Sequence, residues 1–382
     1  MNKTIAILGA TGSVGMQALD VARQRGYKVD VITAGENYKL AERIVREFRP
    51  KYVAMADEMA ARRLQVMIRD LGVRVLSGEK GICECVRESS ADTVVNAILG
   101  GAGLAPTLAA IDSSKRLALA NKESLVIAGD IVMSRARANG VSIIPVDSEH
   151  SAIFQSLHAG KPSEVKRIIL TASGGPFYGR SRAELERITL AETLAHPTWK
   201  MGQKITVDSA TLMNKGFEII EAAHLFSVSP DKIDVVIHRE SILHSAVEYV
   251  DNSIIGEFSV PDMRMCVQYA VDYPERCESK SGSLDLFALG KMTFARPDTA
   301  TFPLLDMAKR AFFAGGACPA VLNAADEIAV DAFLKEKIRF ADIPRVVMST
   351  YDVLGGARYA KNLEDIIGYD KEARRVAKEY VK

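Results

Sequence analysis

Residues 4–15 have the sequence TIAILGATGSVG. The first five residues form a short apolar run, which is typical of a strand buried on both faces of a sheet. Glycines follow at positions 9, 12 and 15, and a helix is expected from about residue 13 to residue 25. Glycine lets the backbone approach a pyrophosphate there, and the N–H groups at the start of the helix bind its charge. The stretch therefore predicts a dinucleotide-binding turn; the alternative is a tight turn without a ligand.

The alternation of strand and helix continues along the N-terminal part of the chain. Further strands are expected at residues 28–33, 52–55, 73–76, 93–98, 117–120 and 141–146, with helices at 38–48 and 57–71. Strands that alternate with helices across short turns predict a mostly parallel, doubly wound sheet. The uncharged stretch 93–111 is interrupted by three glycines and a proline, so a strand, a turn and the start of a helix are favoured over a membrane span.

Four parts are expected along the whole chain, and together they define an α/β protein. They are a Rossmann-like domain with a doubly wound parallel sheet at 1–147, an α/β catalytic and dimerisation domain at 148–272, a connecting segment at 273–301 and a C-terminal four-helix bundle at 302–382. The second part is expected to contain strands near 165–170, 235–238, 246–249 and 254–259. The bundle helices are expected at 304–313, 319–335, 343–354 and 363–381.

The composition excludes several classes of protein. The 382 residues include 49 Lys and Arg against 48 Asp and Glu, so no overall charge attracts nucleic acid or an anionic membrane. A hydrophobic content of 48% argues against disorder. Five scattered cysteines without a CxxC pair, and an N-terminus without a leader pattern, predict a cytoplasmic protein with no nucleic-acid or membrane partner.

Two carboxylates follow the apolar residues 143–146. Residues two apart share one face of an extended backbone, so Asp147 and Glu149 are expected to converge at the carboxyl end of a strand. Carboxylate oxygens suit a hard divalent ion such as Mg²⁺ or Mn²⁺. The alternative is an acidic helix N-terminus, which the helix dipole favours.

A third carboxylate lies in the segment 208–221. Asn214 and Lys215 are four and three residues before Glu218, so the three side chains share one face of the expected helix. Gly216 inside that helix costs about 1 kcal/mol relative to Ala, which indicates that something approaches it closely. The face is expected to complete a metal site and to bind phosphate beside it; the alternative is a solvent-exposed polar face.

Two further segments suggest substrate contacts. Ser173 is followed by Gly174 and Gly175, which form a small turn that favours an anion but also suits an ordinary strand exit. Residues 195–204 form a polar segment that contains Trp199, the only tryptophan in the chain. A lid that closes over substrate is the preferred interpretation, with a loop-anchoring aromatic residue as the alternative.

The choice of nicotinamide cofactor stays open at the level of local chemistry. Glu36 lies 21 positions after Gly15, where an acidic side chain normally binds the ribose 2′-hydroxyl and repels a 2′-phosphate. This position favours NAD. Asn37 and Lys39 are close enough in sequence to bind a phosphate instead.

Taken together, these motifs resemble the 1-deoxy-D-xylulose 5-phosphate reductoisomerase family, nearly from end to end. The resemblance rests on residues 9–15, 119–124, 145–155, 171–177, 196–204 and 206–221. It implies an NADPH- and metal-dependent homodimeric enzyme of the non-mevalonate isoprenoid pathway. Such an enzyme rearranges 1-deoxy-D-xylulose 5-phosphate, a phosphorylated sugar, and reduces the product to 2-C-methyl-D-erythritol 4-phosphate.

The resemblance also implies the site residues. The NADPH site would comprise Thr11, Gly12, Ser13, Val14, Gly35, Glu36, Asn37, Asn121, Glu123 and Gly202. One Mg²⁺ or Mn²⁺ would be bound by Asp147, Glu149 and Glu218, which with Lys122 and His196 form the catalytic set. Substrate would contact Lys122, Ser148, Glu149, Ser173, His196, Trp199, Ser209, Asn214, Lys215 and Glu218. Glu36 departs from the family pattern, in which a basic residue commonly stands near the 2′-phosphate.

Two other functions remain as alternatives. One is an NAD(P)-dependent dehydrogenase of another phosphorylated polyol or semialdehyde, which would act without metal. The other is a non-catalytic NADP-binding sensor, which would need residues 9–15 but not the three carboxylates together.

Overall fold

The computed structural model of the chain describes residues 3–199 and 201–381. The chain forms two compact units, each built from several segments. The first unit extends up to residue 124 and also contains residues 132–151 and 262–281. The second unit contains residues 125–131, 152–261 and the chain from residue 282 onward. The four-part division by sequence stays a prediction.

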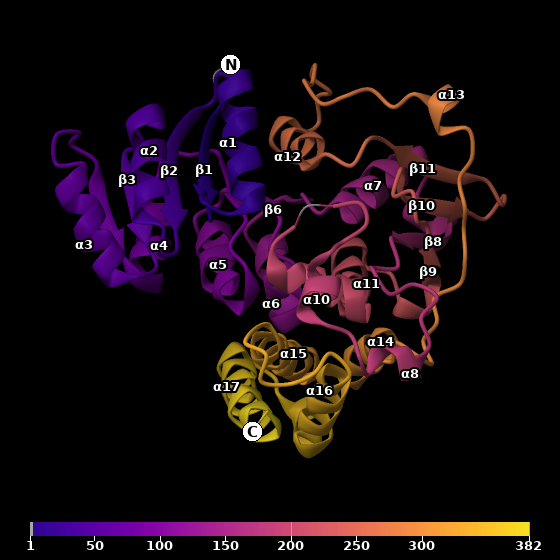
Figure 1. Cartoon of the computed structure of the whole chain (residues 1–382). Helices are drawn as coiled ribbons and strands as arrows, with labels where there is room; N and C mark the ends of the chain where they lie inside the picture. Colours follow the sequence, from indigo (N-terminus) through magenta and orange to yellow (C-terminus); the bar gives the residue numbers. More distant parts are fainter. Residues whose placement is uncertain (1–2, 200, 382) are drawn as a thin grey trace. The chain divides into compact units, whose positions relative to one another are not determined.

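The first unit is built on a sheet of seven parallel strands (Figure 1). Their order is β4-β3-β2-β1-β5-β6-β7, which reverses between β1 and β5, so the carboxyl end of β1 lies at the switch point where such sheets bind ligands. The strands are β1 (Thr4–Leu8), β2 (Lys28–Ala34), β3 (Tyr52–Met55), β4 (Arg74–Ser77), β5 (Thr93–Asn96), β6 (Arg116–Leu119) and β7 (Ile143–Pro145). The doubly wound parallel sheet predicted from the sequence is confirmed.

Helices connect these strands. They are α1 (Ser13–Arg25), α2 (Tyr38–Phe48), α3 (Glu58–Met67), α4 (Gly78–Glu88), α5 (Leu104–Asp112) and α6 (Glu123–Ala138), and α7 (Ser148–Ser156) follows β7. The uncharged stretch 93–111 forms β5, a short 3₁₀ turn and most of α5, as predicted. Among the residues described, no helix is long and apolar enough to cross a membrane. No helix was predicted for α4, although its buried residues Ile82, Cys83, Cys85 and Val86 share one face of the helix.

A helix from much later in the chain completes the first unit. This helix, α12 (Met263–Asp272), packs against α1 and contacts β5, β6 and β7. Asp272 at its end accepts a hydrogen bond from the hydroxyl of Tyr27 at 2.5 Å, and Lys3 Nζ donates to the carbonyl of Val271 at 2.8 Å. These contacts attach residues 262–281 to the N-terminal segment.

The second unit contains a sheet of four strands in the order β11-β10-β8-β9. The strands are β8 (Val165–Ala172), β9 (Ile233–Ile237), β10 (Leu243–Tyr249) and β11 (Ile254–Phe258). β8 pairs in parallel with β9 and antiparallel with β10, and β11 forms one edge. Three apolar side chains of this edge strand are exposed: Ile254, Ile255 and Phe258.

Helices make up the rest of the second unit. They are α8 (Arg182–Leu185), α9 (Leu190–Leu194), α10 (Gln203–Thr211), α11 (Met213–Phe226), α13 (Leu286–Leu289), α14 (Leu304–Ala314), α15 (Cys318–Leu334), α16 (Asp342–Val353) and α17 (Leu363–Tyr380). The four helices predicted near the C-terminus are confirmed as α14 to α17. Figure 1 shows α15, α16 and α17 packed together, and α14 packs against both α11 and α15.

The packing of α14 explains the glycine inside α11. A Cβ atom on Gly216 would lie 2.7 Å from the Cβ of Ala308 on α14, which is closer than two carbon atoms can approach. The close approach predicted at Gly216 is therefore present, and the neighbour is a second helix. Because α11 packs this closely on α14, its opposite face, which carries the polar residues, has a fixed position.

We expect Gly216→Ala to lower the free energy of unfolding by about 1–3 kcal/mol, because the added methyl group overpacks the contact between α11 and α14. Gly368→Ala is the matched control, since a Cβ on this residue of α17 meets nothing within 4 Å. The control should stabilise the protein by up to about 1 kcal/mol, as expected for Gly to Ala in an exposed helix. Urea unfolding measures both, and a stabilised Gly216→Ala protein would contradict this account of the packing.

Candidate functional site

The turn after β1 has the geometry of a dinucleotide-binding turn. Gly9 adopts φ +79°, a conformation that favours glycine, and its N–H donates to the hydroxyl of Thr33 at 3.0 Å. A Cβ on Gly15 would lie 2.1 Å from the carbonyl oxygen of Gly9, so only glycine fits there. The following helix, α1, begins at Ser13 without a side-chain cap and without an acidic residue in its first turn. Its first N–H groups could thus bind an anion.

The other predicted cofactor residues of the first unit lie at the same edge of the sheet. Glu36 and Asn37 follow β2, while Asn121 and Glu123 follow β6, and these strands are neighbours of β1 and β5. Gly35, Glu36 and Asn37 are exposed, and the Asn37 side chain caps α2 by accepting from the N–H of Leu40 at 3.1 Å. Thr11, Gly12 and Val14 are half-buried, and Ser13 is exposed. Gly202 belongs to the second unit, where it precedes α10.

Asn121 holds the backbone around this edge in place. Its buried amide donates to the carbonyls of Ile98 and Gly100 at 2.8 and 2.9 Å, and to the carboxylate of Glu123 at 3.0 Å. A Cβ on Gly103 would collide with the same amide. Asn121 therefore fixes the loop after β5, and Glu123 is one of its partners.

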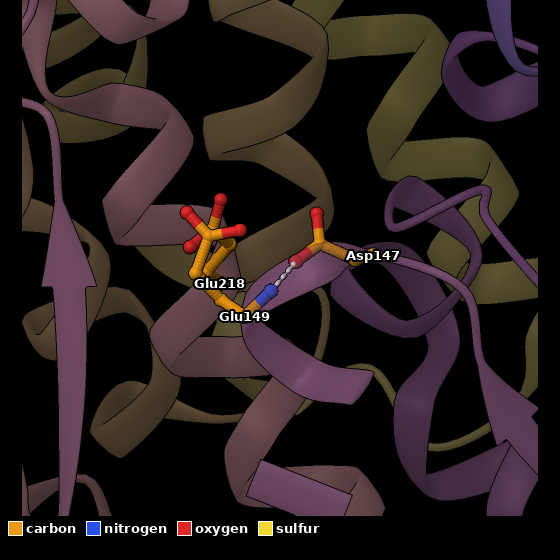
Figure 2. Close-up of side chains that lie close together, drawn as sticks. All are labelled: Asp147, Glu149 and Glu218. Atoms are coloured by element: carbon orange, nitrogen blue, oxygen red, sulfur yellow. Dashed lines mark hydrogen bonds between the residues drawn. The ribbon is translucent and has the colours of Figure 1, made fainter. Parts of the chain in front are cut away.

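The three predicted carboxylates lie together (Figure 2). One oxygen from each of Asp147, Glu149 and Glu218 lies within 4.8 Å of the other two. Asp147 follows β7, Glu149 is in the first turn of α7, and Glu218 is on α11. Such a group of oxygen ligands fits a hard divalent cation.

The reason for the convergence differs from the one expected. Residues 147 and 149 are not alternate residues of a strand, because α7 begins at Ser148. Instead, Asp147 acts as the N-terminal cap of α7, and its Oδ1 accepts from the backbone N–H of Glu149 at 3.1 Å, as Figure 2 shows. The carboxylate pair and the acidic helix N-terminus were alternative interpretations of the sequence, and both describe the structure.

Positive and donor groups surround Asp147 and Glu149. Lys122 Nζ lies 2.9 Å from Asp147 Oδ2, and His150 Nδ1 lies 3.0 Å from Asp147 Oδ1. The hydroxyl of Ser148 donates to Glu149 Oε2 at 2.5 Å. Lys122 and His150 are buried, so these interactions are shielded from water and correspondingly strong.

The polar face of α11 is largely buried, so the alternative interpretation as a solvent-exposed face is wrong. Glu218 is 1% exposed. It accepts a hydrogen bond from Asn214 Nδ2 at 2.5 Å and forms an ion pair with Lys215. Before this helix, Leu212 adopts φ +61°, which ends α10 and separates it from α11. The last turn of α10, which carries Ser209, therefore directly precedes the start of α11.

His196 and two serine hydroxyls form a cluster within the second unit. His196 Nε2 lies 3.1 Å from the hydroxyl of Ser173 and 3.2 Å from that of Ser209. His196 Nδ1 accepts from the backbone N–H groups of Thr198 and Trp199 at 3.2 and 3.0 Å. Because Nδ1 is an acceptor, the imidazole proton is assigned to Nε2, which faces the two hydroxyls.

The double-glycine turn after Ser173 approaches the same cluster. Gly174 and Gly175 adopt φ +77° and +67°, and a Cβ on Gly175 would lie 2.7 Å from the carbonyl oxygen of Ser209. Arg239 closes the turn by donating to the carbonyls of Ser173 and Gly175 at 2.7 and 2.6 Å. The turn is therefore a shaped part of the cluster as well as a strand exit.

The predicted lid connects α9 to α10. Trp199 is half-buried, and its ring lies 6.1 Å from the ring of His244. The structure describes the predicted lid except for residue 200. The N–H groups of residues 198 and 199 bind His196, which ties the lid to the histidine at its base.

Comparison with known proteins accounts for nearly the whole chain. Residues 5–129 match the family model for 1-deoxy-D-xylulose 5-phosphate reductoisomerase, residues 143–226 match the model for its C-terminal domain, and residues 258–376 match a further C-terminal domain model of DXP reductoisomerase. The chain belongs to the 1-deoxy-D-xylulose 5-phosphate reductoisomerase family. The resemblance inferred from the sequence motifs is thus confirmed.

Individual members of the reductoisomerase family are similar over their full length. The reductoisomerase of Acetivibrio thermocellus is 50% identical, and the alignment covers 100% of both chains; that of Caldanaerobacter subterraneus is 48% identical with 100% of both covered. The structure of the Zymomonas mobilis enzyme in complex with NADPH has a TM-score of 0.91 at 40% identity, covering 100% of each chain. A DOX-P reductoisomerase bound to NADPH, fosmidomycin and magnesium has a TM-score of 0.94 at 40% identity, covering 99% of this chain and 98% of that one.

Two residues that support the site were not predicted from the sequence. His150 is fully buried against Asp147, and the signal for it was an Asp and a His three residues apart at a helix start. Arg239 holds the double-glycine turn from 64 and 66 positions away in sequence. No local pattern marks Arg239, because its partners are backbone carbonyls.

Proposed function

We propose that the chain rearranges 1-deoxy-D-xylulose 5-phosphate and reduces the product with NADPH to 2-C-methyl-D-erythritol 4-phosphate. This is the reaction that the family name describes, placed in isoprenoid precursor synthesis. The observation that carries the proposal is the cluster of Asp147, Glu149 and Glu218, because a simple dehydrogenase or a nucleotide sensor has no need for three adjacent carboxylates. The relatives bound to NADPH and to magnesium support it.

The residues at each predicted cofactor position fit the group. The glycine turn and the uncapped start of α1 would hold the pyrophosphate of NADPH, which supplies the hydride for the reduction. The three carboxylates would hold one Mg²⁺ or Mn²⁺, which binds substrate oxygens and stabilises negative charge on them.

The remaining residues bind and orient the substrate. Ser209, Asn214 and Lys215 lie where α10 meets α11, and Ser173 shares His196 with Ser209. The N–H of Met213, the first residue of α11, donates to the hydroxyl of Thr211 at 3.3 Å, and the following N–H groups of the first turn would favour a phosphate. Lys122, buried beside Asp147, places a positive charge where the substrate carbonyl gains negative charge during the rearrangement. In the absence of substrate, the Nε2 proton of His196 faces the hydroxyls of Ser173 and Ser209. When substrate binds, His196 would donate this hydrogen bond to a substrate oxygen instead.

The lid keeps water away from the reaction. His196 and Trp199 move together, because the backbone N–H of Trp199 binds the histidine ring. Phosphate binding at Ser173 and Ser209 would therefore pull on the lid through His196. Binding energy from the phosphate is in this way used to close the site over the reacting carbons.

We extend the proposal to a homodimer in the cytoplasm. The edge strand β11 exposes Ile254, Ile255 and Phe258, with exposed fractions of 55%, 41% and 45%. An exposed apolar edge strand is a surface that pairs with another chain unless it is covered. Five scattered cysteines without a CxxC pair are consistent with the reducing cytoplasm.

Glu149→Gln is expected to abolish turnover and to leave NADPH binding nearly unchanged. Loss of one ligand should weaken Mn²⁺ binding by more than the roughly 100-fold that follows loss of an outer hydrogen-bond partner. Turnover is followed as NADPH oxidation with 1-deoxy-D-xylulose 5-phosphate, and cofactor binding by NADPH fluorescence. Glu88→Gln, at an exposed carboxylate, is the control. Metal-independent oxidation by the unaltered protein would favour the other dehydrogenase, and loss of NADPH binding in Glu149→Gln would contradict the metal assignment.

Glu36→Arg is expected to raise the preference for NADPH over NADH by about tenfold or more, equal to roughly 1.4 kcal/mol, because a cation replaces an anion near the 2′-phosphate. The ratio of kcat/KM for the two cofactors measures this. Glu36→Gln separates the removal of repulsion from the new ion pair and should give a smaller rise. An unchanged ratio in both variants would show that Glu36 does not face the adenosine ribose.

Replacing Ile254 and Ile255 together with Lys is expected to convert a dimer to a monomer, because two charges cannot be buried in an apolar interface without partners. Light scattering on the eluted protein gives the mass directly. Val66→Lys is the control, since Val66 is similarly exposed on α3. A wild-type protein that elutes as a monomer would rule out the homodimer.

A further inference from the structure

Lys204 occupies a position that helices normally deny to a cation. It is the second residue of α10, where the helix dipole disfavours positive charge. Its Nζ lies 2.6 Å from Asp208 Oδ2, one turn along α10, and 3.0 Å from Asp326 Oδ2 on α15. The same ammonium lies 4.9 Å from the ring centre of Phe217 on α11. Lys204 therefore joins three helices of the second unit.

The charges in this contact do not balance with both carboxyl groups ionised. One ammonium faces two carboxyl groups, and Asp208 and Asp326 are only 2% and 0% exposed. Asp208 Oδ1 and both carboxylate oxygens of Asp326 are buried, and none of the three accepts a hydrogen bond from the residues that the structure describes. The contact of Lys204 with Asp326 Oδ2 is therefore an ion pair. One proton shared between the two carboxyl groups supplies the missing donor and makes the cluster neutral.

The helices packed against α10 carry further charged groups, including the fully buried Glu221 on α11, and the charge of Glu327 also acts on Lys204 and Asp326. On α15, Glu327 is bound by Arg374 of α17 at 2.7 Å and by Asn323 at 3.0 Å. On α9, Glu192 accepts from the N–H and hydroxyl of Thr189. On α11, Lys215 pairs with Glu218. Lys204 contacts both Asp208 and Asp326.

The helix held by this contact carries part of the phosphate site. α10 begins one residue after Gly202, at the end of the lid, and Ser209 in its last turn lies 3.2 Å from His196 Nε2. A shift of α10 against α15 would move Ser209 and the end of the lid together.

We propose that Lys204, Asp208 and Asp326 are positioning residues for the phosphate site, and that the two carboxyl groups share one proton while they hold α10 against α15. The positioning role rests on the proposed function, because it assumes that phosphate binds at Ser209. The proton-sharing contact itself does not.

The contact should weaken in alkaline solution. Burial, and next the charge of Asp326, raise the pKa of Asp208 to about 8, although Lys204 opposes the rise. Burial also raises the pKa of Asp326. A carboxyl group whose pKa is raised in the folded protein stabilises it fully below the unfolded pKa of about 4 and loses that stabilisation as the pH rises through the folded pKa. Above about pH 8, two buried carboxylates repel each other across one ammonium.

The test follows the binding of inorganic phosphate by the fluorescence of Trp199, the only tryptophan, from about pH 7 to about pH 9.5. Thermal unfolding is recorded over the same range. The wild-type protein should lose roughly tenfold in phosphate affinity, less than the ~100-fold that a 1 Å misplacement can cause. Asp326→Asn, which resembles the protonated carboxyl group, should remove that loss and the alkaline fall in melting temperature. Asp331→Asn, at an exposed carboxylate of the same helix, should behave as the wild type.

Comparison between variants cancels the titration of phosphate itself. Equal alkaline losses in the wild type and in Asp326→Asn overturn the positioning role. Absence of any phosphate response at every pH overturns both that role and the proposed phosphate site, whereas the melting temperatures still report the shared proton. Asp208→Asn provides the same test if Asp326→Asn does not fold. The proposal is also contradicted if the wild-type protein loses no more phosphate affinity at pH 9.5 than the titration of phosphate itself explains.

Discussion

Three carboxylates within 4.8 Å of one another repel, and much of the surrounding structure provides the positive charge that keeps them there. Lys122 binds Asp147, Lys215 binds Glu218, and the hydroxyl of Ser148 donates to Glu149. Each of these groups is close in sequence to a carboxylate or at the end of a neighbouring strand, so the same folding that assembles the carboxylates assembles their partners. A divalent cation would neutralise the negative charge that these groups do not balance. The cluster is therefore suited to bind such a cation and destabilises the fold without it.

The helices differ in whether a side chain caps their first backbone N–H groups. Several helices begin with a side-chain cap, as α2 does with Asn37 and α3 does with Asp57. Neither α1 nor α11 has one, although a cap is worth about 0.5–2 kcal/mol. These two helices follow the turn at Gly9 and the helix break at Leu212. The first N–H groups of α1 would bind the pyrophosphate of the proposed cofactor, and the stabilisation that a cap provides would come only with that ligand. In α11, the N–H of Met213 already donates to the hydroxyl of Thr211 at 3.3 Å.

Local patterns in the sequence predicted much of this arrangement, and the failures have physical causes. The strands and the glycine turn at 9–15 were predictable because burial and backbone conformation are local properties. Asp147 and Glu149 do lie close together, but the predicted reason was wrong. They were expected to share one face of an extended strand, whereas β7 ends at Pro145 and α7 begins at Ser148, so the start of the helix brings them together. The contact between Lys204 and Asp326 was not predictable, because no periodicity links residues of two separate helices. Its members become a group only after α10 has packed on α15.

The route of the chain through the first unit has a consequence for its synthesis. This unit includes residues 262–281, and α12 is attached to its N-terminal segment through Lys3, Tyr27 and Asp272. All of residues 152–261, which belong to the second unit, must be translated before α12 exists. At ordinary rates of translation this takes roughly 5–20 s. The parallel sheet must therefore wait on the ribosome with the side of α1 that α12 covers still exposed, and α12 becomes available only after all four strands of the second unit have been made.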